Sequence, residues 1–437
     1  MLGRIRERRG LLGVAVLIGA IAASAVVALA ADDSSSTRSA KPAVAGNGSQ
    51  AERPRRSPTR DVLAVSNNWD GTVDLVDPRT FKRLKRINIV PDYDERFAEI
   101  ATNPVDFAFF VAIREQIGEG HDQLADDAFT SPDGRFLYVS RPSFADVVAI
   151  NMKTGKIKWR FPMEGQRSDH MAISRNGRRV LVSDSTANKV HAIDTATGRS
   201  LGSFPSGDSP HENNFSRDGK RIYHASIGRV YTPTDDPGLA PSKGAEYFQI
   251  VNARTLKVIK RLNMGEVLER AGYPDMSAAV RPMTFSPDER FVYFQVSFFH
   301  GFVEYDLKAH KVRRVATLPI AQHTQEIQRE DYLLDSAHHG IAMNPRGTKL
   351  CVAGTMSDYV AIVSRKTFRY RIFPLGIGAK PYWSTPSADG RYCFVSISGQ
   401  DRVAVISYAR QRRVATFRVG DHPQRMRTGV VRRAFLR

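Results

Sequence analysis

Residues 190–194 read Val-His-Ala-Ile-Asp, and this pattern decides the fold because the chain repeats it. A polar turn and a second β-prone run follow it, as in Asp194 to Gly198 before Leu201. This layout is typical of an antiparallel hairpin. The repeated motif has five positions: an apolar residue, any residue, two apolar residues, and then Asp, Asn or Ser. It occurs seven times, at 73–77, 147–151, 190–194, 248–252, 302–306, 360–364 and 403–407.

A turn motif supplies the other half of each repeat. Ser131-Pro132-Asp133-Gly134 has Pro at the second position and Gly at the fourth, which favours a type I turn. The repeat is therefore a unit of four strands, A to D, in which this turn joins A to B. Six copies of the turn are found for seven hairpins, at 131–134, 174–177, 216–219, 286–289, 344–347 and 387–390.

The C-terminus contains a candidate for the missing A strand. Residues 420–425 (Gly-Asp-His-Pro-Gln-Arg) align with residues 207–212, which lead into the A strand of the fourth copy. Pairing of residues 424–430 with the strand at Val62–Ser66 would close the ring, and closure removes unpaired strand edges. The sequence thus predicts an all-β fold for residues 61–437. The expected architecture is a seven-bladed β-propeller of four-stranded antiparallel blades with short helical insertions.

The B strands resemble the repeat of the YVTN family of seven-bladed β-propellers. Matching segments are Tyr138-Val139-Ser140, Leu181-Val182-Ser183-Asp184, Ala64-Val65-Ser66-Asn67 and Phe394-Val395-Ser396. The resemblance covers about residues 61–430. It implies a fold like that of the quinoprotein amine dehydrogenase-like and lactonase-like propellers. The functions of the family are varied, so the resemblance implies no particular chemistry.

The first 60 residues differ from the repeats. Residues 1–31 combine an arginine-rich start with an uncharged run of 22 residues from Gly10 to Ala31 and a small-residue site at Ala28-Leu29-Ala30. This is typical of a signal peptide or, if uncut, of a membrane anchor. Arg8-Arg9 also resembles a twin-arginine signal. Residues 32–60, rich in Ser, Pro, Ala and Arg, are predicted to be a disordered linker.

Export follows from either interpretation, because positive charge before the apolar run keeps the N-terminal end cytoplasmic. We therefore expect an extracytoplasmic protein, secreted or anchored to the outer face of the cytoplasmic membrane. Membrane contact is expected only through the N-terminal segment, and the protein is expected to be a monomer.

The chain is strongly basic, with a net charge of +19. The first 60 residues hold ten Lys or Arg and four Asp or Glu, which leaves +13 for the repeats. Nine Arg and one Asp lie between Ala409 and Arg437. Such a surface can attract nucleic acid or another polyanion, or can serve only to keep the protein soluble.

Cys351 and Cys393 are the two cysteines of the chain and fall in the B strands of adjacent repeats. Their positions predict opposite faces of the two strands, and opposite faces of neighbouring blades can face each other. A disulfide in an exported protein and a pair of buried thiols both remain open.

The working face is predicted at the end of the ring that carries the B–C and D–A connections, because the long insertions fall there. One of them, from Phe107 to Ile117, has helical periodicity. The insertions occupy residues 90–120, 231–245, 266–280 and 321–336.

Polar residues also converge on this end. His211 and His339 precede their A–B turns by the same number of residues, so both are expected at one level of the channel mouth. Other copies place Asp126, Asp169, Arg281 and Tyr382 at that level. His170 and Glu212 are expected one residue deeper, and His300 on a B–C loop. Convergent polar groups favour a binding site, although water-filled propeller channels also give a solvated lining.

The histidines admit a divalent metal. His211 and His339, with Glu212 or Asp169, could bind zinc or copper. His338 is expected to point away from the channel, because adjacent strand residues face opposite sides.

Three functions follow from these patterns. The main prediction is an exported, membrane-tethered or secreted propeller that binds a ligand or macromolecule at the upper face without catalysis. The second is a metal-assisted hydrolase or oxidoreductase that uses His211, His339 and Asp169. The third is nucleic-acid or polyanion binding through the basic surface.

Overall fold

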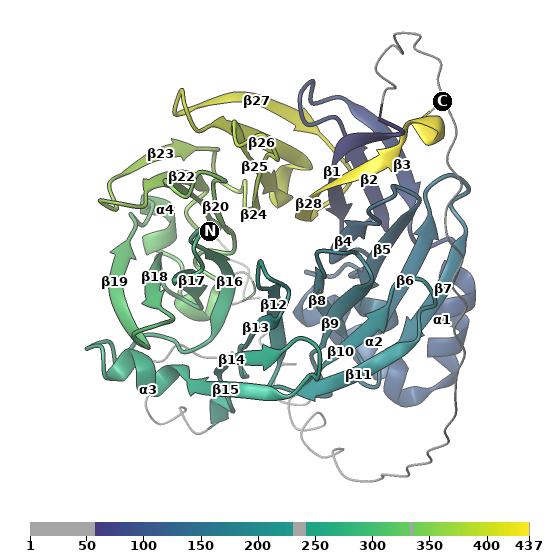
Figure 1. Ribbon diagram of the computed structural model, residues 1–437, viewed down its shortest axis with the longest axis horizontal. Helices are drawn as coiled ribbons and strands as arrows, with labels where there is room; N and C mark the ends of the chain where they lie inside the picture. The colour runs from purple at the N-terminus through teal and green to yellow at the C-terminus, as the bar shows by residue number, and fades with distance from the viewer. Residues whose placement is uncertain (1–56, 230–241, 333, 335, 437) are drawn as a thin grey trace, which may run out of the picture. The chain divides into compact units, whose positions relative to one another are not determined.

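Seven antiparallel sheets of four strands form a ring (Figure 1). The computed structural model describes residues 57–229, 242–332, 334 and 336–436. Residues 56–437 form one compact unit and residues 1–55 another. The predicted signal segment and most of the predicted linker therefore lie outside the described residues.

Each blade runs from strand A to strand D, and the A strands of neighbouring blades contact one another. Blade 1 consists of β28 (Pro423–Arg432), β1 (Thr59–Asn67), β2 (Thr72–Val76) and β3 (Arg83–Asn88), and blade 2 of β4 (Asp127–Thr130), β5 (Phe136–Arg141), β6 (Asp146–Asn151) and β7 (Ile157–Pro162). Blade 3 consists of β8 (Ser168–Ile173), β9 (Arg179–Asp184), β10 (Lys189–Asp194) and β11 (Ser200–Pro205), and blade 4 of β12 (Pro210–Phe215), β13 (Arg221–Ser226), β14 (Tyr247–Asn252) and β15 (Val258–Asn263). The strands of blades 5 to 7 are β16 (Val280–Phe285), β17 (Phe291–Val296), β18 (Gly301–Asp306) and β19 (Lys311–Thr317); β20 (Ile341–Met343), β21 (Lys349–Gly354), β22 (Tyr359–Ser364) and β23 (Tyr370–Pro374); β24 (Pro381–Pro386), β25 (Tyr392–Ile397), β26 (Arg402–Ser407) and β27 (Arg412–Arg418).

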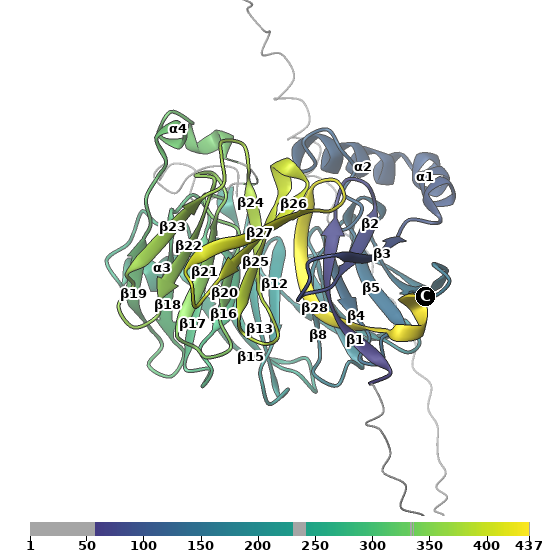
Figure 2. The same ribbon diagram turned by 90° about the horizontal axis from the view of Figure 1, so that it is seen from above.

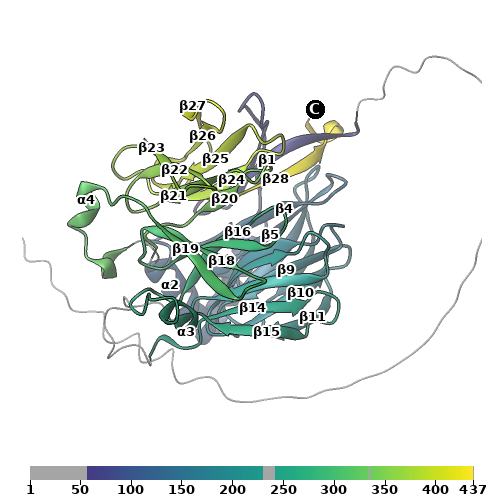
Figure 3. The same cartoon turned by 60° about the vertical axis from the view of Figure 1, so that its left-hand side comes forward.

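The C-terminal strand closes the ring. β28 pairs with β1 antiparallel, with Gly429 opposite Val62 and Met426 opposite Val65. Figure 3 shows β28 beside both β1 and β24, so the first and last parts of the ring meet here. The predicted seven-bladed propeller and its closure by the C-terminal strand are confirmed.

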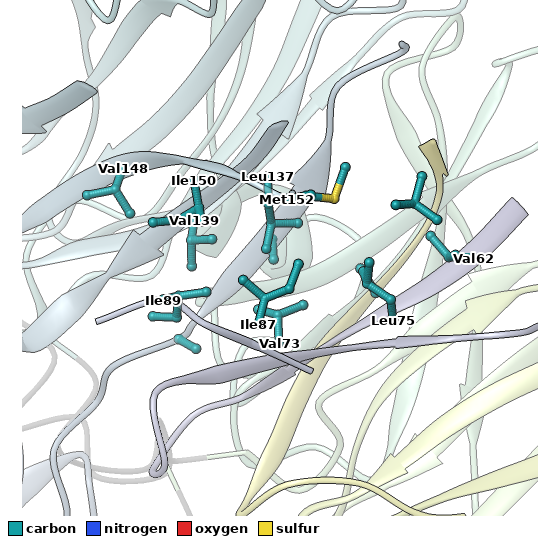
Figure 4. Close-up of a cluster of buried hydrophobic side chains, with 14 residues drawn as sticks. Val62, Val73, Leu75, Ile87, Ile89, Leu137, Val139, Val148, Ile150 and Met152 are labelled. Carbon is teal, nitrogen blue, oxygen red and sulfur yellow. The ribbon is translucent and has the colours of Figure 1, made fainter. Parts of the chain in front are cut away.

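Alternating apolar residues build the interfaces between blades. Val73 and Leu75 on β2 pack with Leu137 and Val139 on β5 (Figure 4). Along each strand, the two packed residues are separated by one residue whose side chain faces the other way. Alternate strand residues share a face, so both sheet faces of a central strand are covered by neighbouring blades. Each Å² of apolar area removed from water stabilises the fold by about 25 cal/mol, so these apolar interfaces are the main source of the ring's stability.

The A–B turns have the predicted chemistry. Glycine holds a positive φ at the fourth position, for example 68° at Gly177 and 67° at Gly347, a conformation that other residues adopt only with strain. Both glycines lie against a proline of the preceding A–B turn, Pro132 and Pro287, where a side chain would collide. The short turns therefore also pack one blade against the next.

Helices lie at the opposite end of the ring, where the long insertions were predicted. Figure 2 shows α1 (Tyr93–Thr102), α2 (Pro104–Gln116) and α4 (Gln322–Gln325) on this side. Asn103 caps α2 by accepting hydrogen bonds from two backbone N–H groups, and Pro104 suits its first turn. The other helical segments are α3 (Met264–Glu269) and the 3₁₀ turns η1 (Pro142–Phe144), η3 (Arg329–Asp331), η5 (Ser398–Gln400) and η6 (Arg433–Leu436).

The predicted helix at residues 107–117 is present as part of α2. Phe110 and Ile113 are its buried residues, and Phe110 packs with Ile100 and Phe144. Within the described ranges, no helix is both long enough and apolar enough to cross a bilayer.

Cys351 and Cys393 form a disulfide, with their Cα atoms 6.5 Å apart. The bond joins β21 to β25 and so links blades 6 and 7 through their B strands. Of the two alternatives that the sequence left open, the structure shows the disulfide.

Candidate functional site

The A strands are irregular at their upper ends, meaning the end of the ring with the B–C and D–A connections. In blade 3, Ser168 pairs with Asp184 and Met171 pairs with Val182. Asp169 and His170 therefore lie opposite the single residue Ser183, which is the pattern of a β-bulge. A bulge breaks the strict alternation of side chains, so neighbouring residues can both be directed to the centre of the ring.

The same irregularity recurs around the ring. Register shifts occur at the upper ends of the A strands of five blades, at Gln424–Arg425, Asp169–His170, His211, Arg281–Pro282 and Tyr382–Trp383. The residues that the sequence singled out as a polar ring are thus mostly residues of these bulges. The bulges give the centre its density of polar side chains.

Three histidines from three blades meet at this level. His170, His211 and His339 each offer a ring nitrogen that lies within 4.8 Å of those of the other two. The ring centroids of His170 and His211 are 3.7 Å apart, and His339 lies 5.6 Å from His211 and 6.0 Å from His170. A tetrahedral zinc ion with three His ligands would need ring nitrogens roughly 3.3 Å apart, which lies within the 4.8 Å limit that these three residues meet.

Each of the three rings has a buried nitrogen without a hydrogen-bond partner among the described residues. These atoms are Nε2 of His170, Nδ1 of His211 and Nδ1 of His339. A buried polar atom that lacks a partner costs about 1–3 kcal/mol, so three in one cluster require an explanation. An unprotonated imidazole nitrogen can act as a metal ligand, so a bound ion would satisfy these atoms.

The other ring nitrogens of His170 and His339 are held in place by hydrogen bonds. Nδ1 of His170 hydrogen-bonds to Oε2 of Glu212 at 2.7 Å, and Glu212 also accepts a bond of 2.9 Å from the side-chain amide of Asn214. Nε2 of His339 hydrogen-bonds to the Tyr382 hydroxyl at 3.4 Å, and the two rings stack with centroids 4.1 Å apart. A carboxylate behind a histidine is the usual outer support of a metal-bound imidazole.

Electrostatics favour the neutral form of all three rings. Burial lowers the pKa of His170, His211 and His339 well below the ordinary value, and nearby positive charges add to the effect. Arg425 acts on His170 and His339, and Arg281 acts on His211. The neutral imidazole is the form that binds metals.

Arginines pair with the carboxylates around the histidines. Arg425 bonds to Asp126, and Arg427 forms a two-pronged pair with Asp127 at 2.9 and 2.7 Å. Arg167 bonds to Asp169 at 2.8 Å. Burial raises the pKa of Asp126 to about 7, although the charge of Arg425 opposes the shift. Asp126, Asp169 and His170 form a second group whose ligand atoms lie close together.

The centre is buried, which departs from the expected channel mouth. His170 is 0 % exposed, His339 1 % and His211 3 %, and Asp126, Asp169, Glu212, Arg281 and Tyr382 are likewise buried. Bulky side chains from the bulges fill the space, with the rings of Tyr382 and Trp383 beneath the Arg425 guanidinium. The polar ring is therefore packed and hydrogen-bonded rather than a solvated lining.

Two histidines lie away from the centre. His300 hydrogen-bonds to the Tyr332 hydroxyl at 3.0 Å and its ring lies 5.5 Å from that of His338. His338 in turn contacts Tyr359. The structure places both His338 and His300 in this second cluster rather than in the central one.

Arg281 takes part in the centre indirectly. Its guanidinium donates to the Ser297 hydroxyl and to the Leu334 carbonyl, both at 2.8 Å. It therefore supplies positive charge beside His211 rather than a ligand atom.

Sequence reasoning missed Arg425, Arg427, Asp127 and Trp383. Arg425 had a signal, because the alignment of residues 420–425 with 207–212 sets it opposite Glu212. The other three had none, because their roles depend on which A strands become neighbours. Of the insertion predicted at 231–245, residues 231–241 lie outside the described residues.

Comparison with known proteins adds the fold and no more. No protein-family model matches the chain, and no curated protein matches it in sequence. A solved structure of hydrazine synthase from Kuenenia stuttgartiensis is similar, with a TM-score of 0.54 and 14 % sequence identity over 71 % of this chain and 96 % of the other. At this identity the likeness concerns the propeller fold alone.

Proposed function

We propose that the protein is an exported β-propeller that binds a transition-metal ion, copper or zinc, at the three-histidine cluster in the centre of its ring. One observation carries the proposal. His170, His211 and His339, from three blades, each offer a ring nitrogen within 4.8 Å of the other two, and each ring has a buried nitrogen without a hydrogen-bond partner among the described residues. Imidazole ligands suit copper and zinc, and copper is the more tightly bound of the two at most sites.

Charge suggests what completes the coordination. The carboxylates of Asp126, Asp127 and Asp169 already have arginine partners. A divalent ion would add positive charge beside Arg281 and Arg425, so we expect an anionic fourth ligand such as hydroxide or a small carboxylate. The carboxylate of Glu212 holds Nδ1 of His170 at 2.7 Å, which leaves Nε2 of that ring for the ion.

The buried centre favours a metal-holding role over turnover. The three rings are buried, Trp383 and Tyr382 pack against His170 and His339, and Arg425 packs on Tyr382 and Trp383 in turn. We therefore favour metal binding over the hydrolase or oxidoreductase alternative, which has no separate observation in its favour. The YVTN relationship likewise remains a prediction from the B strands.

The test is metal-dependent stability of untagged protein. At a metal concentration of about 100 times Kd, stabilisation of about 2.7 kcal/mol should raise the Tm by about 3 °C. His339→Gln should abolish this shift and the bound metal found by elemental analysis. His338→Gln is the matched control, because His338 is adjacent and equally buried but lies in the other cluster.

The control should unfold at a lower temperature yet keep the full metal-dependent shift. If zinc, copper, nickel and cobalt leave the wild-type Tm unchanged, the proposal is wrong. An equal loss of the shift in both variants would also contradict it, because the effect would then come from packing.

Export is the second part of the proposal. The arginine-rich start and apolar run of residues 1–31 support it, and so does the disulfide between Cys351 and Cys393, since disulfides persist in oxidising compartments. Cell fractionation of the full chain should recover it outside the cytoplasm. Replacing Arg8 and Arg9 by Lys should block this only if the twin-arginine route is used. Recovery of wild-type protein in the cytoplasm with free thiols would contradict export.

A further inference from the structure

Positive charge is concentrated on one end of the propeller. Because the strands of each blade are antiparallel, the A–B and C–D turns all lie at the lower end, opposite the helices. We call this end the lower face. Its turn residues are 61, 77–83, 131–136, 151–157, 174–179, 194–200, 216–221, 252–258, 286–291, 306–312, 344–349, 364–370, 387–392, 407–413 and 429–433.

These turns account for all the net charge of the propeller. They hold 29 Lys or Arg and nine Asp or Glu, a net charge of +20, whereas residues 61–437 as a whole carry +13. The rest of the propeller is therefore net negative by seven charges. Positive charge is thus separated from negative charge between the lower face and the rest of the propeller. A surface whose charge served only solubility would not need such a separation.

The acidic residues of the lower face are occupied within their own turns. Asp77 accepts hydrogen bonds of 2.8 Å from the backbone N–H groups of Arg79 and Thr80. Asp194 and Asp306 do the same in the C–D turns of blades 3 and 5. Asp133, Asp306 and Asp389 also form ion pairs with Arg135, Arg290 and Arg391. With nine acids against 29 cations, most of the lower-face cations still lack a carboxylate partner.

Many cations of the lower face point to solvent. In blades 6 and 7, none of the described cations Lys366, Arg369, Arg410, Arg412 and Arg413 forms a salt bridge, and all five are exposed. Neighbouring turns also touch, since Arg175 donates to the Arg217 carbonyl and Arg217 to that of Pro287. These two bonds join the A–B turns of blades 3, 4 and 5 to one another.

The N-terminal segment joins the propeller at this same face. β1 begins at Thr59, opposite Arg432, and the N–H of Arg432 donates to the carbonyl of Gly134 in the A–B turn of blade 2. The 27 residues from Ala31 to Ser57 can span at most about 90 Å when extended. A chain anchored in a bilayer through residues 10–31 would thus be tethered by its basic face.

We propose that the lower face docks on an anionic phospholipid surface and orients the central site and the helices away from the membrane. Exposed Lys and Arg beside an anionic leaflet contribute about 1 kcal/mol each at moderate salt. The inference is independent of the metal site. It assigns the propeller itself a membrane contact, beyond the N-terminal segment.

The test measures orientation on vesicles with the full chain. Both native cysteines are in the disulfide, so a single added cysteine can be labelled. A fluorophore on Thr255→Cys marks the lower face, and one on Gln116→Cys marks the end of α2. With phosphatidylglycerol vesicles at 50 mM salt, energy transfer to a headgroup acceptor should be stronger from position 255. With phosphatidylcholine, or at 500 mM salt, the difference should disappear.

Matched variants link the effect to this face. Removing three lower-face charges should weaken docking about a hundredfold at roughly 1 kcal/mol per cation, whereas removing three charges elsewhere should change it less than threefold. The lower-face variant is Lys366→Gln with Arg369→Gln and Arg412→Gln. The control is Arg160→Gln with Arg270→Gln and Arg418→Gln. Thermal melts establish that both triple variants are folded.

Equal transfer from positions 116 and 255, or equal weakening by the two triple variants, would overturn the proposal. Tight binding of polyphosphate or DNA combined with no response to phosphatidylglycerol vesicles would overturn it in favour of a soluble polyanion. If polyphosphate or DNA displaces the docked protein only at concentrations high enough to screen charge in general, this result would support docking on phospholipid.

Discussion

At the residue scale, His422 shows how burial sets protonation. Its ring is 3 % exposed and stacks on Trp69 with centroids 3.9 Å apart, while His121 covers the other face of Trp69 at 3.8 Å. Burial lowers the pKa of His422 to about 3, and the charges of Lys380 and His121 act in the same direction. The neutral ring is therefore part of the folded state.

The sign of the pH effect follows. The folded-state pKa lies below the unfolded value of about 6.5, so the stabilisation is complete above pH 6.5 and is lost as pH falls toward 3. Between pH 7.5 and 5.0 the wild type should lose about 2 kcal/mol more unfolding free energy than His422→Asn. Asn tolerates the φ of 49° at this position.

Urea unfolding at the two pH values measures the difference, and His310→Asn is the control. His310 has a similar φ of 54° but is exposed. Its replacement should leave the pH dependence unchanged. The interpretation fails if His422→Asn has the same pH dependence as the wild type.

At the element scale, the repeats predicted the strands but not their defects. The apolar pattern and the Ser-Pro-Asp-Gly turns suffice for blades, because strand pairing and turn type are local properties. The bulges at Asp169–His170 and Tyr382–Trp383 have no local signature, since they arise where seven A strands converge. His170 was expected one residue deeper than His211, and the bulge brings both rings to one point.

The burial of the central polar residues could not be predicted from the sequence either. Whether a polar ring is solvated depends on which side chains fill the axis, and Arg425 and Trp383 reach it from blades 1 and 7. Their residue types are compatible with a surface or with a packed cation–π contact. Only the assembled ring decides between the two.

At the scale of the whole molecule, β28 closes the ring and contacts blades 2 and 7 besides pairing with β1. β28 contributes the buried side chains Met426 and Val431, and it carries Arg425 and Arg427, which pair with Asp126 and Asp127 of blade 2. The last strand therefore joins blade 1 to blade 2 by charge and apolar packing as well as by backbone pairing. It also supplies part of the polar centre.

Deleting residues 421–437 should accordingly destroy cooperative unfolding or lower the Tm sharply. The deletion exposes the edge of β1 and removes the arginine partners of the buried carboxylates of Asp126 and Asp127, and breaking one buried ion pair from one side costs about 3–5 kcal/mol. A shorter deletion of residues 434–437 keeps all of β28 and is the control, which should retain a single sharp transition in calorimetry. A melt of the longer deletion that matches the control would mean that blades 2 to 7 are stable without closure. In that case β28 would serve the central site through Arg425 and Arg427 rather than the stability of the ring.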